Sequence, residues 1–187
     1  MPRLSPGSRF EPLILTTIHD DAVPIPDPHS LVHLQFRRFA GCPICNVHLR
    51  SVARRHDEIR SAGVREVVVF HSSAEDMRPH QGDLPFAAVA DPERLLYDEF
   101  GVTTSRRAVI HPSAWTTPLR PSVYPVVLRG LRNGGSPGPR HGDTVLGLPA
   151  DFLIAADGRV VAALYGRHAN DQWSVDDLLR LAGQAVP

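Results

Sequence analysis

The chain contains no lysine, because all 20 of its basic residues are arginine. Chemistry that needs a lysine amine, as a nucleophile or to form a Schiff base, is therefore excluded. The 20 basic residues are balanced by 20 acidic ones, so the formal net charge is zero. Without an excess of positive charge, the composition predicts neither a nucleic-acid partner nor attraction to an anionic membrane surface.

Long hydrophobic runs are also missing. No stretch approaches the roughly 20 apolar residues that a membrane-spanning helix needs. The N-terminal sequence MPRLSPGSRFEP lacks the apolar core of a signal peptide. We therefore expect a cytoplasmic protein without membrane contact. In that compartment thiols stay reduced, and disulfides are mostly catalytic or redox-sensing.

Cysteine is scarce: the chain has two, Cys42 and Cys45, within the sequence FAGCPICNVH. This CPIC pair has four candidate explanations, namely a redox couple, half of a metal site, a static disulfide, or chance. A static disulfide here would close a very small loop, which gains little entropy. A zinc site needs about four ligands, and with no second CxxC the others would come from His48, His56 or His71. We expect no metal.

The surroundings of the pair predict a strand that leads into a helix. LVHLQF at 31–36 alternates apolar and polar residues, as a strand does. Cys42 stands at the N-cap of the predicted helix, and Pro43 follows at the first helical position. A thiol at a helix N-terminus is biased toward thiolate, and Cys45 lies on the same helical face one turn later. This arrangement favours a dithiol–disulfide couple.

The remaining elements follow in a regular order. Strands are predicted at 64–70, 86–90 and on both sides of an Asp157–Gly158 turn, and helices at 93–100, around 122–132, and after a cap at Ser174. Proline-rich residues 1–29 are predicted to be an irregular N-terminal extension packed on the domain. Residues 103–143 form a long insertion before the last β-hairpin. The order predicts an α/β domain over 30–187 with a thioredoxin-like fold, a central mixed sheet flanked by helices.

Pro149 is a second feature that favours redox chemistry. It stands in GLPADFLI, immediately before the predicted strand that follows the insertion. In thioredoxin-like proteins a cis-proline at this point faces the CxxC and supplies a backbone edge for the substrate. The alternative is an ordinary proline at the start of a strand. Because CPIC is also present, we favour a cis bond between Leu148 and Pro149.

Five blocks of the sequence resemble the peroxiredoxin-like (AhpC/TSA, redoxin) branch of the thioredoxin superfamily. They are LVHLQFRRFAGCPICNVHLRS, VVVFHSSAEDM, ADPERLLYDEFGV, LPADFLIAADGRVVAALYGRH and DQWSVDDLL, in the family's order over roughly residues 30–182. The resemblance implies a thiol oxidoreductase that reduces a peroxide or a disulfide and is restored by an external thiol reductant. It further implies pairing as a homodimer. We expect no cofactor.

Two positions depart from the family's pattern. When Cys45 is aligned with the cysteine of its Pro-x-x-x-Thr-x-x-Cys motif, Cys42 falls on the threonine and Arg38 on the proline. The family's later arginine falls near Leu148 and Pro149. These departures favour cycling of a disulfide over rapid turnover of peroxide.

Roles can be predicted for individual residues. We expect Cys42 to attack and Cys45 to resolve the intermediate as a disulfide, whereas the family alignment reverses these roles. The predicted substrate-binding residues are Pro43, Leu148, Pro149 and Arg38. Arg37 and Arg38 precede the loop and would favour a thiolate, but solvent-facing charge is their more ordinary explanation.

Two functions from other classes stay open as alternatives. In one, the domain is a thioredoxin-fold binding or redox-sensing module without efficient catalysis, and 103–143 forms its partner-binding surface. In the other, less favoured, CPIC belongs to a zinc-binding protein. Thiol consumption faster than that of free cysteine separates the enzyme from the binding module, and metal analysis tests the zinc site.

Overall fold

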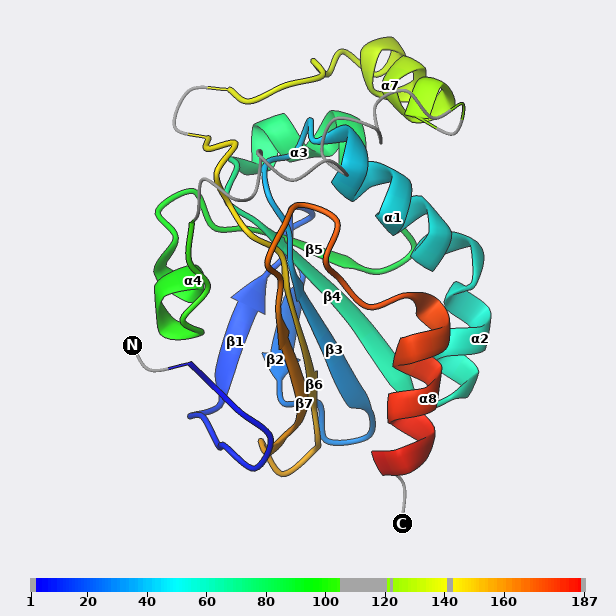
Figure 1. The fold of residues 1–187 in the computed structure, drawn as a ribbon. Coiled ribbons are helices and arrows are strands. Elements are labelled where there is room, and N and C mark those ends of the chain that lie inside the picture. The colour runs from blue at the N-terminus through cyan, green and yellow to red at the C-terminus, as the bar shows by residue number, and fades with distance from the viewer. Residues whose placement is uncertain (1–2, 105–120, 122, 141–142, 186–187) are drawn as a thin grey trace.

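The structure, a computed structural model, describes residues 3–104, 121, 123–140 and 143–185. Its centre is a five-stranded mixed sheet in the order β5–β4–β3–β6–β7 (Figure 1). The strands are β3 (Leu31–Phe36), β4 (Val64–Phe70), β5 (Ala87–Ala90), β6 (Ala150–Ile154) and β7 (Val160–Tyr165). β4 pairs in parallel with β3 and β5, whereas β6 pairs antiparallel with β3 and β7. The predicted thioredoxin-like α/β fold is confirmed.

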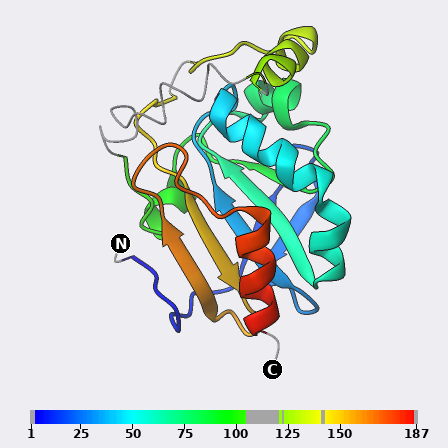
Figure 2. The ribbon, with the colours of Figure 1, turned by 45° about the vertical axis from the view of Figure 1, so that its right-hand side comes forward.

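Helices cover both faces of this sheet. One face carries α1 (Pro43–Arg54), α2 (His56–Ser61) and α8 (Val175–Ala185), which lie in front of the sheet in Figure 2. The short helix α4 (Leu95–Glu99) lies beside the opposite face. At the end of the molecule where α1 begins lie α3 (Ala74–Gln81) and α7 (Val123–Arg132). No helix within the described ranges is long and apolar enough to cross a membrane.

Side chains along β3 alternate between the two faces of the sheet. Val32, Leu34 and Phe36 point to one face, where they enter a cluster of buried apolar side chains. On β4, residues 67–70 are all fully buried, because helices or strands cover both faces of that strand. Complete burial of such a side chain stabilises the fold by about 1.5–3 kcal/mol. The apolar pattern at 31–36 and 64–70 therefore fixes the two central strands.

The N-terminal extension contains two strands that the sequence analysis missed. β1 (Leu13–Thr16) pairs antiparallel with β2 (Ala22–Ile25), and the pair forms a separate two-stranded sheet. Leu15, Val23 and Ile25 enter the same core cluster as β3. Proline argued against a strand here, but both strands of a two-stranded sheet are edge strands, where proline is tolerated. The prediction of irregular structure was wrong.

Helix α3 was also missed. Pro79 lies inside it and removes one helical hydrogen bond, so the sequence reads as a helix breaker. The signal that would have found it is the cap: Ser73 Oγ accepts a hydrogen bond from the Asp76 N–H at 3.2 Å. The helices predicted at 93–100 and around 122–132 are present as α4 and α7.

Candidate redox site

Cys42 and Cys45 lie where β3 leads into α1, and both thiols are buried. Each residue is only 1% exposed. Their Sγ atoms lie 2.8 Å apart, and both cysteines are free rather than joined in a disulfide. The two side chains belong to an apolar cluster that includes Phe39, Ile44 and Leu49. A disulfide between them can therefore form with little movement of the backbone.

The start of α1 holds Cys42 as predicted. Cys42 is the N-cap residue, and its Sγ accepts a hydrogen bond from the Cys45 N–H at 3.5 Å. Pro43 opens the helix, at a position where its missing N–H costs nothing. The positive end of the helix dipole favours a negative charge on the sulfur pair.

Two arginines lie beside the thiols, and both are buried. Arg37 is 0% exposed and Arg38 is 5% exposed, so the expectation that they face solvent was wrong. Strand pairing continues beyond β3, with the Arg37 N–H donating to the Val69 carbonyl at 2.9 Å. Arg37 therefore continues the strand face of His33 and Gln35, which helices cover. Arg38 Nη1 lies 3.9 Å from the Sγ of Cys42.

The two thiols have unequal pKa values. Burial opposes ionisation of Cys45, but the hydrogen bond from Cys42 and the charges of Arg38 and Arg37 outweigh it and lower its pKa to about 7. Burial, together with the hydrogen bond to Cys45, raises the pKa of Cys42 well above its usual range. The reduced pair therefore carries its first negative charge on Cys45, while Cys42 keeps its proton.

Replacing Arg38 with methionine should make the pair harder to ionise. A neighbouring cation lowers the pKa of an acidic group by about 1–3, so its loss should raise the pKa of Cys45. Alkylation by iodoacetamide at pH 7 should slow by at least about fivefold, because only the thiolate reacts. The pH dependence of alkylation measures this. The alkylation rate of Arg38→Lys should lie between those of the wild type and Arg38→Met, and the exposed Arg180→Met should leave the rate unchanged. An unchanged pH profile in Arg38→Met would contradict this role of Arg38.

A group of polar side chains that includes Arg37 lies on the face of β3 that packs against α1, and all of them except the half-buried His48 are buried. Its members are His33, Gln35, Arg37, His48, Glu66 and Asp151. Arg37 Nη2 lies 2.6 Å from the Oδ1 of Asp151. His33 lies between two carboxylates, with Nδ1 2.9 Å from Glu66 and Nε2 3.1 Å from Asp151. His48 Nε2 lies 3.2 Å from Arg37 Nη2. These contacts hold the Arg37 guanidinium in place.

The pKa values of this network follow from its contacts. Burial opposes ionisation of Asp151, but Arg37 and His33 hold the pKa of that carboxyl well below its usual range. Against the effect of burial, Glu66 and Asp151 raise the pKa of His33 to about 9. Burial and then the charge of Arg37 lower the pKa of His48 to about 3, so His48 is neutral. At neutral pH the network thus pairs two cations with two carboxylates.

Stability should fall above pH 6.5 as His33 loses its proton. The pKa of His33 is about 9 in the folded state and 6.5 ordinarily. Its contribution is therefore fully present below pH 6.5 and is lost as the pH rises through 9, on the order of 3 kcal/mol in all. Urea unfolding across this range, compared with His33→Gln, measures it. A stability difference between the two proteins that stays constant up to pH 9.5 would refute the coupling.

Leu148 and Pro149 directly precede β6, whose first residue, Ala150, accepts a hydrogen bond from Arg37 Nη1 at 3.4 Å. Among the described residues the cis peptide bond joins Ile25 and Pro26, so the Leu148–Pro149 bond is trans and the predicted cis bond was wrong. The Pro149 carbonyl accepts a hydrogen bond from the Gly166 N–H at 2.9 Å. The chain thus enters β6 already extended and paired, which a trans bond allows.

The histidines near CPIC in the sequence have separate surroundings. His48 contacts Arg37, and the ring of His56 packs on Phe86 with a centroid distance of 5.7 Å. His71 Nδ1 lies 3.7 Å from Asp143. In the part of the chain that the structure describes, no group of three or more His, Cys, Asp or Glu residues is arranged to hold a metal ion.

Sequence reasoning missed the polar network and the burial of the two arginines. The available signal was the alternation in LVHLQFRR, which places His33, Gln35 and Arg37 on one strand face. Polar residues on a strand ordinarily indicate the solvent side. Here that face is covered by helices, so the same pattern marks a buried network instead.

Comparison with known proteins identifies the family of the chain. The fold and a buried dithiol flanked by arginines define a thiol oxidoreductase. The AhpC/TSA antioxidant enzyme family matches residues 51–168, which is more than half of the chain. The protein belongs to this family. The matched stretch begins after CPIC, so the cysteine pair rests on the sequence and the geometry described above.

Solved structures share the fold at low identity. Peroxidoxin BcpB from Mycobacterium tuberculosis is 12% identical, with a TM-score of 0.69 and 99% of each chain covered. The reduced 2-Cys peroxiredoxin of Plasmodium vivax is also 12% identical, with a TM-score of 0.64, 96% of this chain and 81% of that chain covered. A putative thiol:disulfide interchange protein DsbE from Chlorobium tepidum is 16% identical, with a TM-score of 0.58 and 98% and 96% covered. A search of curated proteins found no match.

Proposed function

We propose that Cys42 and Cys45 are the redox couple of this enzyme and that its substrate is a small hydroperoxide. The observation that carries the proposal is the pair of sulfurs 2.8 Å apart, with two buried arginines that favour a thiolate at Cys45. The thiolate is the nucleophilic form of cysteine. Arginine N–H groups beside it also stabilise charge that develops on a leaving oxygen.

The reaction follows from the unequal ionisation of the pair. The Cys45 thiolate attacks one peroxide oxygen, the O–O bond breaks, and the leaving oxygen takes up a proton as water or an alcohol. Cys45 is then a sulfenic acid. Cys42 gives up its proton and attacks the Cys45 sulfur, so an S–S bond forms and water leaves. The dithiol has lost two electrons to the peroxide, and an external thiol restores it.

This assignment reverses the roles expected from the N-cap position alone. The N-cap gives Cys42 the helix dipole, but against the effect of burial the hydrogen bond from Cys42 and the charges of Arg38 and Arg37 lower the pKa of Cys45. Cys45 is also the position that the family motif assigns to the attacking cysteine. The same two arginines provide cations near the sulfur where the family's later arginine is replaced by proline. They favour peroxide over disulfide as the substrate.

Oxidation of the reduced protein with one equivalent of hydrogen peroxide tests the proposal. Mass spectrometry should show the loss of two hydrogens and a disulfide that links Cys42 and Cys45. A parallel reaction with a small organic disulfide should be slower. If the disulfide reacts faster, the enzyme is a disulfide exchanger, and if neither oxidant consumes the thiols, the assignment of the couple fails.

A further inference from the structure

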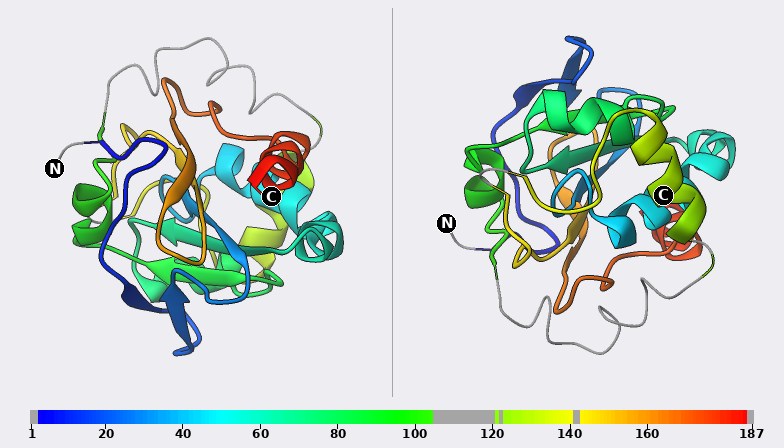
Figure 3. Two further views of the ribbon diagram at one scale, coloured as in Figure 1. Left: turned by 90° about the horizontal axis from the view of Figure 1, so that it is seen from below. Right: turned by 90° about the horizontal axis from the view of Figure 1, so that it is seen from above.

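The segment that follows α7 identifies the kind of partner this site accepts. Resting on the proposed function, we propose that the redox couple exchanges electrons with small molecules only, and that its reductant is a low-molecular-weight thiol rather than a protein. The segment concerned comprises residues 133–140 and is called the cover below. It runs across the end of the molecule where α1 begins, as the view from above in Figure 3 shows.

The cover lies directly on the turn that precedes Cys42. The Gly138 N–H donates to the Gly41 carbonyl at 3.4 Å. A Cβ atom on Gly41 would lie 2.3 Å from the Ser136 carbonyl oxygen and 2.7 Å from that of Gly138. Only glycine fits at position 41 while the cover is in place. The turn that carries the thiols is thus in contact with the backbone of the cover.

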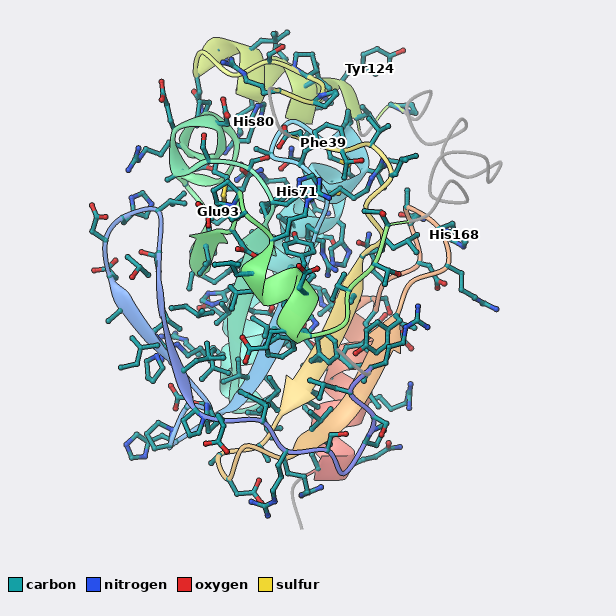
Figure 4. The ribbon with its side chains drawn as sticks, turned by 90° about the vertical axis from the view of Figure 1, so that its left-hand side faces the viewer. Phe39, His71, His80, Glu93, Tyr124 and His168 are labelled. Carbon is teal, nitrogen blue, oxygen red and sulfur yellow. The ribbon has the colours of Figure 1, made fainter. Side chains whose placement is uncertain are left out.

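Contacts with α3 anchor the cover at both of its ends. Near its start, Gly135 packs so closely on the ring of His80 that a Cβ atom there would lie 2.5 Å from Nε2. Figure 4 shows His80 between α3 and α7. At its end, Arg140 Nε lies 3.2 Å from the Oδ1 of Asp76. Asp76 belongs to the first turn of α3, so one helix holds both ends.

Two residues beyond the cover, Asp143 and Val145, connect the chain to the loop that precedes Cys42. Ser72 Oγ donates to Asp143 Oδ1 at 2.6 Å and accepts from the Ala40 N–H at 3.0 Å. Arg38, which lies beside the thiol pair, donates through Nη2 to the Val145 carbonyl. Asp143 also accepts from the Arg140 N–H at 2.8 Å. These hydrogen bonds link the cover to the loop that precedes the two cysteines.

Size then discriminates between partners. A protein reductant must bring its sulfur onto a cysteine that is 1% exposed, and a typical protein interface buries about 800 Å² per partner. Such a partner has to displace the cover. A hydroperoxide or a small thiol needs a gap only a few atoms wide. One small thiol forms a mixed disulfide with the oxidised pair, and a second releases it, so that two thiols become one disulfide and the dithiol is restored.

Reduction of the peroxide-oxidised protein by two donors, dithiothreitol and a thioredoxin, tests the proposal. In the wild type, thioredoxin should be no faster than dithiothreitol at equal concentration. In a variant with both Arg140→Ala and Asp143→Ala, the cover loses its contact with Asp76, and the chain just beyond it loses its contact with Ser72. Its thioredoxin rate should rise by at least about tenfold, while the dithiothreitol rate changes by less than about twofold. The exposed pair replaced by Asp57→Ala and Arg60→Ala is the control.

A second variant keeps the proposal testable if the double variant fails to fold. In Gly41→Ala the added Cβ atom would clash with the cover, so this variant should also be reduced faster by thioredoxin than the wild type. A wild type that thioredoxin reduces more than about tenfold faster than dithiothreitol would overturn the proposal, as would variants whose thioredoxin rate stays at the wild-type value. These outcomes leave the redox couple intact. If hydrogen peroxide fails to oxidise the pair in the first place, it is the proposed function that fails.

Discussion

Replacing Cys45 with serine should slow peroxide consumption by at least about a thousandfold, the scale on which enzymes lose activity with their nucleophile. The remaining thiol, Cys42, keeps its proton because burial raises its pKa. Stopped-flow measurement of peroxide consumption gives the rate. After the reaction, a sulfenic-acid probe should find nothing to label in this variant.

The matched variant is Cys42→Ser. Cys45 retains its arginine neighbours there, so one turnover should produce a sulfenic acid that the probe labels and that cannot close to a disulfide. Serine accepts a hydrogen bond at position 42 and keeps the helix cap. Labelling of Cys45→Ser instead of Cys42→Ser would assign the attack to Cys42.

Asp151→Ala should cost about 3–5 kcal/mol of unfolding free energy, the usual effect of removing one partner from a buried ion pair. Asp151 is fully buried and contacts both Arg37 and His33. The substitution leaves two buried cations with one carboxylate, Glu66. Urea unfolding at pH 7 measures the loss.

The control for this substitution is Asp57→Ala. Asp57 forms an exposed i,i+3 pair with Arg60 at 3.3 Å, and such pairs contribute less than about 1 kcal/mol. Asp151→Asn, which keeps the shape and removes the charge, should lie between the two. A loss below 1 kcal/mol in Asp151→Ala would mean that the network does not support the fold.

Much of the fold was predictable because its signals are local. The alternation at 31–36, the N-cap at Cys42 and the proline that follows each lie within a few residues and specify a strand, a turn and a helix start. The strand at 64–70 is apolar throughout, which indicates burial on both faces. The CPIC pair, placed at a strand-to-helix junction, was therefore predicted to be a redox centre.

The rest depends on contacts between residues far apart in the sequence. Arg37 is buried because Asp151 lies on the adjacent strand β6, more than a hundred residues away, and no local pattern reports that pairing. The cover packs on Gly41 through backbone atoms of Ser136 and Gly138, whose sequence indicates only a loop. Contacts between distant residues thus account for the buried arginines and for the cover, which the sequence analysis did not predict.

The most direct test of the redox assignment is stopped-flow oxidation of the fully reduced wild-type protein by hydrogen peroxide as a function of pH. The two thiols should disappear together, faster than free cysteine at pH 7. The rate should rise with a midpoint at pH of about 7, where Cys45 ionises. Oxidation no faster than that of free cysteine at any pH between 6 and 9 would contradict the assignment.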